Sequence, residues 1–157
     1  MRSVLYKAAL SIALTAVAAL GADNTLGTWK LNVAKSKLAS NPSPLKTLTI
    51  VREASGDGVK LTSTGERADG SKVNTSYTAK YDGSESTVTG TGLQYDRISI
   101  KQVNADTFTD ERKKAGGQYH ATGRTVISNG GKTMTITIKG ANADRKAFTS
   151  TLILDKQ

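Results

Sequence analysis

Apolar and polar residues alternate along most of this chain, in short runs separated by polar, glycine-containing turns. Alternation with a period of two places every second side chain on one face of a β-strand. The 3.6-residue period of an amphipathic helix is not sustained anywhere after the first 22 residues. The pattern predicts about ten short strands, at residues 26–32, 45–54, 58–66, 72–81, 86–90, 94–103, 107–114, 119–128, 133–139 and 146–156.

The connections between these strands indicate how the strands are arranged. Most are tight turns, such as SGDG at 55–58 and NGGK at 129–132, which join neighbouring antiparallel strands as hairpins. Residues 33–44 differ, because both prolines of the chain lie there, and they predict a loop or a short lid. Closure into a barrel protects the edges of such a long meander. We therefore expect an all-β fold, an antiparallel up-and-down meander of about eight to ten strands closed into a barrel, with a β-sandwich as the alternative.

The more apolar face of each strand is expected to point into the barrel, where eight to ten strands leave space for a small ligand. This inward set comprises Trp29, Leu31, Leu48, Ile50, Val59, Leu61, Val73, Tyr77, Ala79, Tyr81, Ile98, Ile100, Met134, Ile136, Ile138, Phe148, Leu152 and Leu154. Two further strands bring charge inward. An inward Phe108 also turns Asp110 and Arg112 inward. An inward Val126 does the same for Arg124.

Charges inside a barrel are costly unless they are paired, so these strands allow several interpretations. Asp110 can form a structural ion pair with an arginine. A different register can instead place Ile127 inward and Arg124 in water. If an arginine remains free, it can hold a carboxylate or phosphate group with two hydrogen bonds, assisted by tyrosine hydroxyls.

The first 22 residues have the features of a secretory signal peptide. A basic start precedes 13 apolar residues, and the small residues Gly21 and Ala22 follow. The apolar run is shorter than the roughly 20 residues that span a bilayer. We expect cleavage after Gly21 or Ala22, which leaves residues 23–157 as a single barrel domain. The chain has no cysteine, so the exported protein has no disulfide, and we expect it in the periplasm or outside the cell.

The charge of the chain is strongly positive. The 22 basic and 13 acidic residues give +9, and removal of Arg2 and Lys7 with the leader leaves 20 minus 13, or +7. A basic exported protein attracts anionic partners, among them the envelope surface. Residues 112–114, with Lys101, Lys132 and Lys139, are expected to supply an outer basic surface. Nucleic acid is not expected as a partner, because export separates the two and no recognition motif is present.

The first predicted strand carries a family resemblance. Gly27, Thr28 and Trp29 lie at its start, and this Gly-x-Trp resembles the first motif of the lipocalins, in which the tryptophan closes one end of an up-and-down barrel. The segments GTWKLN, YTAKYDG and GKTMTIT are similar to a group of secreted bacterial lipocalin-like proteins of unassigned task. The resemblance implies a lipocalin-like barrel over residues 24–156. The second motif, the long helix after the eighth strand and the disulfide have no counterpart, and the arginine that lies over the tryptophan has two candidates, Arg124 and Arg145.

Catalysis has little support in the sequence. His120 is the only histidine, no Gly-x-Ser-x-Gly elbow is present, and a zinc site is not expected with one histidine and no cysteine. The Asp-Gly pairs lack the alternating acidic ligands of a calcium loop and are explained as turns. We therefore expect no cofactor, no metal and no enzymatic activity; an enzyme using interior arginine, aspartate and tyrosine residues is the least favoured alternative.

The sequence favours an exported, monomeric binding protein for a small hydrophobic or amphipathic ligand, which the interior arginines would allow to be anionic. The candidate ligand-binding residues are Trp29, Tyr77, Tyr81, Arg112 and Arg124. Trp29 is expected mainly to close a barrel end. The alternative is an envelope-surface module with a filled interior, which binds polyanions or a protein partner through its basic exterior. The two differ in one feature, because only the binding protein needs a cavity.

Overall fold

The computed structural model describes residues 22–40 and 43–157. The predicted signal peptide, apart from Ala22, lies outside the described residues, as do two residues of the predicted loop at 33–44. Within the described part of the chain, no helix is both long enough and apolar enough to cross a membrane.

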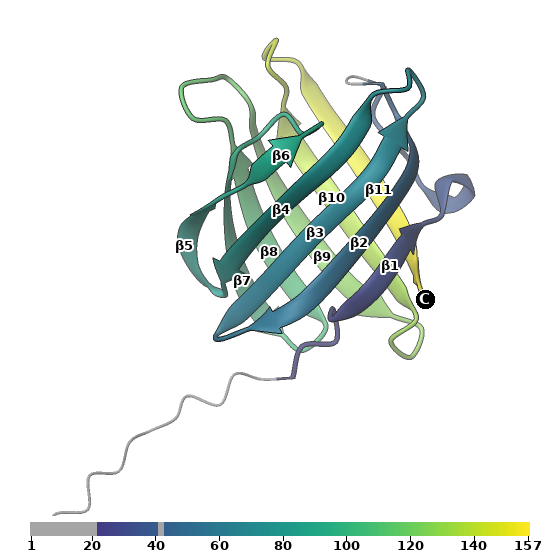
Figure 1. Ribbon diagram of the computed structural model, residues 1–157, viewed down its shortest axis with the longest axis vertical. Helices are drawn as coiled ribbons and strands as arrows, with labels where there is room; N and C mark the ends of the chain where they lie inside the picture. Colours follow the sequence, from purple (N-terminus) through teal and green to yellow (C-terminus); the bar gives the residue numbers. More distant parts are fainter. Residues whose placement is uncertain (1–21, 41–42) are drawn as a thin grey trace, which may run out of the picture.

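Eleven antiparallel strands form one up-and-down sheet that nearly closes into a barrel (Figure 1). The sheet order is β5-β7-β8-β9-β10-β11-β1-β2-β3-β4-β6. The strands are β1 (Gly27–Leu31), β2 (Leu45–Ser55), β3 (Gly58–Arg67), β4 (Lys72–Lys80), β5 (Asp82–Thr87), β6 (Thr89–Thr91), β7 (Arg97–Asn104), β8 (Thr107–Lys113), β9 (His120–Ser128), β10 (Thr133–Ala141) and β11 (Ala147–Lys156). A single 3₁₀ turn, η1 (Val33–Lys35), follows β1. The fold class expected from the alternation is confirmed.

The strand count exceeds the expected eight to ten because one predicted strand is divided. Residues 82–87 (β5) pair with β7 at one edge of the sheet, and residues 89–91 (β6) pair with β4 at the other edge. Val88 lies between the two halves and is buried, with its N–H donating to the Asp96 carbonyl oxygen at 2.9 Å. One extended segment therefore changes partners at Val88 and brings the two edges of the sheet together.

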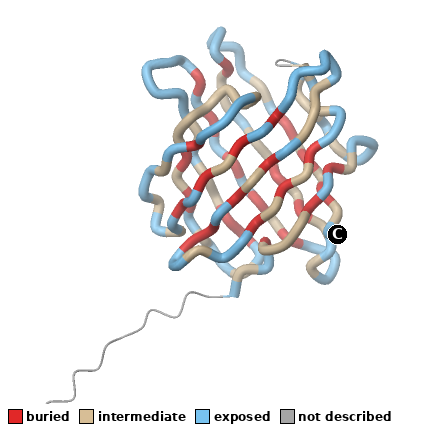
Figure 2. Tube along the Cα trace, viewed as in Figure 1, coloured by how far each residue is buried: buried red, intermediate tan, exposed pale blue. Residues whose placement is uncertain are grey.

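Burial alternates along the strands as the sequence predicts (Figure 2). Every member of the predicted inward set is buried except Tyr81, Ile138 and Phe148, which are partly buried. Side chains of the opposite parity, largely threonine, serine and lysine, face outward. The period-two pattern thus separates the inner from the outer face correctly in nearly every strand.

In β9, the odd-numbered residues are buried, whereas an inward Val126 would require the even-numbered residues to face inward. Ile127 is buried and Arg124 is exposed, paired in the sheet with Thr109 and Thr137. Of the two registers that the sequence allows, the one with Ile127 inward is observed, and the inward placement of Arg124 is wrong. The observed register buries the larger Ile127 and leaves the guanidinium charge in water, which avoids the cost of burying it.

Trp29 and the residues that precede β1 close the end of the barrel at which β1 begins. The Trp29 ring is fully buried, and its Nε1 donates to the Thr25 carbonyl oxygen at 2.8 Å. The Asn24 N–H donates to the Ala105 carbonyl oxygen at 3.0 Å, which ties this segment to the turn before β8. The cation over the Trp29 ring is Lys156, with Nζ 5.1 Å from the ring centroid. Neither predicted arginine occupies this position.

Candidate functional site

The barrel contains a cavity of about 160 Å³, measured as the space open to the centres of water-sized molecules. It is lined by strands β2, β3, β4 and β7 to β11, together with the loop residues Leu38, Ala39, Pro44, Leu93, Gln94, Tyr95 and Tyr119. Most of the wall is aliphatic or aromatic. A space of this size holds on the order of ten waters, or one small organic molecule.

An ion pair lies in the part of the cavity wall that β8 forms. Arg112 and Asp110 are two residues apart on β8 and both face inward, as predicted. Arg112 Nε donates to Asp110 Oδ1 at 2.5 Å, and a terminal nitrogen donates to Oδ2 at 3.1 Å. Burial acts to lower the pKa of the Arg112 guanidinium, but the charge of Asp110, its hydrogen bonds to Arg112 and the neighbouring Tyr95 and Tyr119 together hold that pKa above its ordinary value. The pair is thus largely self-compensated.

Gly123 provides the space in which this ion pair is formed. It lies opposite Asp110 in the β8–β9 register. A Cβ atom at position 123 would overlap the Asp110 carboxylate. The Arg112 guanidinium also lies 5.4 Å from the centre of the Tyr95 ring, which adds a cation–π contact on another side.

A second guanidinium lies deeper in the barrel, near its closed end. Arg52 on β2 is only 6% exposed. Its carbon Cζ lies 5.9 Å from the Phe108 ring centroid, and one terminal nitrogen is 3.5 Å from the Tyr81 hydroxyl oxygen, at the limit of a hydrogen bond. Arg52 Nε is buried without a hydrogen-bond partner. Among the described residues, no carboxylate oxygen lies within 4.0 Å of this guanidinium.

Like Arg52 Nε, a threonine hydroxyl in the cavity wall has no hydrogen-bond partner. Thr75 on β4 is 3% exposed, and its Oγ1 makes no hydrogen bond. Arg52 and Thr75 are the two residues of the described chain whose buried side-chain atoms are left unpaired, and both line the same cavity. Unpaired buried polar atoms are uncommon in native proteins, because each loses its hydration without compensation.

Tyrosines surround both arginines. Burial raises the pKa of Tyr81 and of Tyr119 to about 12, and nearby positive charge, on Arg52 and Arg112 respectively, opposes the increase. Burial also raises the pKa values of Tyr77 and Tyr95. All four hydroxyls therefore stay protonated at neutral pH and can donate hydrogen bonds. Tyr81 donates to the Asp23 carboxylate, which links Arg52 indirectly to the segment that closes the barrel.

The opposite end of the barrel forms the rim of the cavity, and Arg67 organises it. Its two terminal nitrogens donate to the carbonyl oxygens of Ser43 and Gly92, at 2.9 and 2.8 Å. Burial lowers the pKa of this guanidinium, which is half-buried, and the charge of Asp69 opposes the decrease. Arg67 therefore ties the loop before β2 to the segment after β6.

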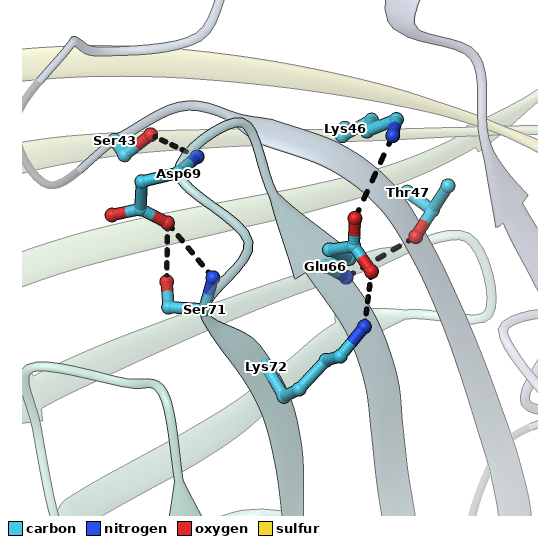
Figure 3. Close-up of polar contacts among 7 residues, drawn as sticks. All are labelled: Ser43, Lys46, Thr47, Glu66, Asp69, Ser71 and Lys72. Carbon is cyan, nitrogen blue, oxygen red and sulfur yellow. Dashed lines mark hydrogen bonds and ion pairs between the residues drawn. The ribbon is translucent and has the colours of Figure 1, made fainter.

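Contacts between side chains and the turn after β3 reinforce this rim (Figure 3). The Asp69 N–H donates to Ser43 Oγ at 3.1 Å. Glu66 lies between Lys72, to which it is hydrogen-bonded, and Lys46, whose Nζ is 3.6 Å away. The hydrogen bond from Lys72 and the charge of both lysines lower the pKa of the Glu66 carboxyl.

The structure brings only part of the predicted site together. Tyr77 and Arg112 line the cavity. Trp29 and Tyr81 lie at the closed end, outside the cavity lining, and Arg124 lies on the outer surface.

The sequence analysis did not identify Arg52, Tyr95 or Tyr119 as site residues. A signal for Arg52 was present, because it continues the inward parity of Leu48 and Ile50 on the same strand. Tyr95 and Tyr119 fall at the start of the predicted strands 94–103 and 119–128, where the predicted alternation turns both outward. The structure places them just before β7 and β9, so they do not follow that alternation.

The remaining surface offers little support for other chemistry. Within residues 22–40 and 43–157, no group of three or more His, Asp or Glu side chains could hold a metal ion. His120 is exposed at the start of β9. Comparison of the sequence with protein-family models and with curated proteins gave no match.

Proposed function

We propose that this protein is an exported, non-enzymatic binding protein that holds one small hydrophobic or amphipathic molecule inside its barrel. The proposal is carried by the cavity of about 160 Å³, between walls that are mostly aliphatic and aromatic. Protein interiors are normally close-packed, and unfilled apolar space lowers stability. A bound ligand would recover the missing contacts, which gives a physical reason for keeping the space open.

Two features of the sequence support the rest of the proposal. The N-terminal leader favours export to the periplasm or the cell exterior. The Gly-x-Trp at Gly27 to Trp29 favours a relationship with secreted lipocalin-like proteins, and the position of Trp29 at the closed barrel end is compatible with it. Neither feature identifies the ligand.

The alternative, a surface module with a basic exterior, has weaker support. It needs a filled barrel and a cluster of uncompensated charge. Arg112, which was assigned to the outer basic surface as well as to the interior, points inward. Its neighbours are paired with acids: Lys113 Nζ lies 2.5 Å from Glu85 and Lys114 Nζ lies 2.7 Å from Asp96.

A cavity-filling substitution tests the proposed function. Ser63 is buried and lines the cavity, whereas the next residue, Thr64, is exposed on the outer face of the same strand. Ser63→Phe places a ring in the cavity, and Thr64→Phe adds the same ring to the outer surface. Binding of 1-octanol, a neutral probe, is measured by isothermal titration calorimetry on the purified protein and on both variants.

We expect the protein and Thr64→Phe to bind 1-octanol at one site with a dissociation constant below about 1 mM. This corresponds to a binding free energy more favourable than about −4 kcal/mol. Ser63→Phe should remain folded, judged by circular dichroism, and lose this binding. Native mass spectrometry of protein purified without denaturant should also reveal a bound mass that unfolding releases. If 1-octanol and octanoate both fail to bind, or bind Ser63→Phe equally well, the barrel is not a binding cavity and the surface module becomes the better explanation.

A further inference from the structure

We propose that Arg52 and Thr75 form a head-group site for a carboxylate at the closed end of the cavity, so that the ligand is a single-chain amphiphile with one negative charge. This inference rests on the proposed function, because it names the class of ligand that the cavity takes.

The first support is the state of Arg52. The residue is 6% exposed, and its Nε is buried without a hydrogen-bond partner. The Phe108 ring and the Tyr81 hydroxyl carry no charge, and the Asp23 carboxylate is linked to Arg52 only through that hydroxyl. Removing an ion from water costs several kcal/mol unless an opposite charge compensates it. A carboxylate is the group that fits a guanidinium with two parallel hydrogen bonds, and Arg52 is one of the residues that line the cavity.

The second support is the position of Thr75. In the sheet register, Arg52 lies opposite Leu61, and Leu61 lies opposite Tyr77. Thr75 is two residues before Tyr77 on β4 and therefore faces the same interior, one step towards the rim. Its unpaired Oγ1 can donate to a carboxylate oxygen held at Arg52. One ligand group would thus pair both of the buried orphan atoms in the described chain.

The other two arginines of the cavity wall are already engaged. Arg112 donates two hydrogen bonds to the Asp110 carboxylate, which supplies the opposite charge. Arg67 donates to two backbone carbonyl oxygens and holds the rim together. Among the guanidiniums that line the cavity in the described residues, only Arg52 combines deep burial with an unpaired nitrogen and no carboxylate oxygen within 4.0 Å.

The geometry also indicates how the ligand would lie. Arg52 is near the end of the barrel that Trp29 and the preceding segment close, and the rim with Leu38 and Leu93 lies at the other end. The head group would enter first, and the chain would extend along the aliphatic wall towards the rim. A monoanion balances the one uncompensated charge, whereas a dianionic phosphate would leave a net negative charge in the barrel.

Three eight-carbon probes that differ only in the head group test this site: octanoate, 1-octanol and octylamine. Their affinities are measured by isothermal titration calorimetry at neutral pH for the protein, for Arg52→Met and for Arg124→Met. Arg124→Met is the matched control, because it removes the same charge from the outer surface. Thr75→Val, which keeps the shape of the side chain and removes the hydroxyl, is a second test that does not depend on the folding of Arg52→Met.

We expect the protein and Arg124→Met to bind octanoate at least about tenfold more tightly than 1-octanol, and octylamine most weakly. Arg52→Met should lose the preference for octanoate over 1-octanol. Thr75→Val should reduce that preference several-fold. If 1-octanol binds but octanoate is not preferred, or if the preference survives in Arg52→Met, the head-group site is wrong while the binding cavity stands. If no probe binds, the proposed function itself fails.

Discussion

Replacement of Arg52 by methionine should stabilise the unliganded protein, although most buried substitutions destabilise. The arginine leaves a buried Nε unpaired and makes one hydrogen bond at the 3.5 Å limit. An unsatisfied buried donor costs about 1–3 kcal/mol. The cation–π contact with Phe108, at 5.9 Å, returns about 0.5–2 kcal/mol. Methionine replaces the aliphatic part of the arginine side chain and has no polar hydrogen, so we expect a net gain of about 1 kcal/mol.

Arg112→Met should have the opposite effect, although this arginine lies in the same cavity. Its removal leaves the Asp110 carboxylate, only 8% exposed, without the guanidinium that compensates it. Loss of one member of a buried ion pair costs about 3–5 kcal/mol. Two chemically identical substitutions, on strands β2 and β8, are therefore expected to change stability in opposite directions.

The assay is urea unfolding of the ligand-free protein, followed by circular dichroism and checked by thermal unfolding. For a chain of this size, 1 kcal/mol corresponds to about 4 °C in Tm. Protein stripped of any co-purified ligand is essential, because a bound ligand stabilises the folded state by mass action. Addition of saturating octanoate should then reverse the order, with the unsubstituted protein more stable than Arg52→Met.

A destabilisation of more than about 1 kcal/mol by Arg52→Met would refute this reasoning. It would mean that Arg52 supports the closed end of the barrel through the Tyr81 hydroxyl and the Asp23 carboxylate. Tyr81→Phe separates the two accounts: it breaks that chain of contacts but leaves the cavity charge in place, so a structural Arg52 predicts similar losses for both variants.

Two further predictions follow from the buried side chains of the barrel. The four tyrosines of the described chain have pKa values raised above the ordinary value near 10, to about 12 for Tyr81 and Tyr119, so spectrophotometric titration of the folded protein should give tyrosine midpoints above 10. Because folding raises these pKa values, the associated stability is complete below pH 10 and is lost as pH rises towards 12; a folded protein that titrates with a midpoint near 10 would contradict this. Gly123→Ala should cost about 1–3 kcal/mol in urea unfolding, because the new Cβ displaces the Asp110 carboxylate, whereas the exposed Thr122→Ala should change stability by less than about 0.5 kcal/mol.

The sequence was a good guide to the fold because alternation is a local property. A strand with one buried face must place its apolar residues two apart, and tight turns between strands favour neighbouring pairs. The division of residues 82–91 between two partners was not visible, because it depends on how the two edges of the sheet meet. That junction is set by the closure of the whole barrel, and no local pattern encodes it.

The site was less predictable, and Arg52 and Arg124 show why. Arg52 has the inward parity of Ile50, but a charge at the end of an apolar run is easily taken for the point where the strand leaves the core. In β9, both Val126 and Ile127 are plausible inward residues, so parity alone leaves the orientation of Arg124 open. The observed register also places Gly123 against Asp110. That requirement comes from the neighbouring strand, and a single strand's pattern does not contain it.

The two inward arginines also favour the proposed binding site over a packing defect as the reason for the cavity. A barrel that only needed to be stable could carry methionine or leucine at position 52, with no orphan Nε and no uncompensated charge. The charge of Arg112 is instead compensated within the barrel by the Asp110 carboxylate, and Gly123, opposite Asp110 in the sheet, leaves space for that carboxylate. The fold thus supplies an internal anion for one guanidinium and leaves the other without one, at the closed end of a cavity that is otherwise apolar. The proposed anionic ligand would account for that asymmetry, and affinity and ligand-free stability would then depend in opposite senses on the same side chain.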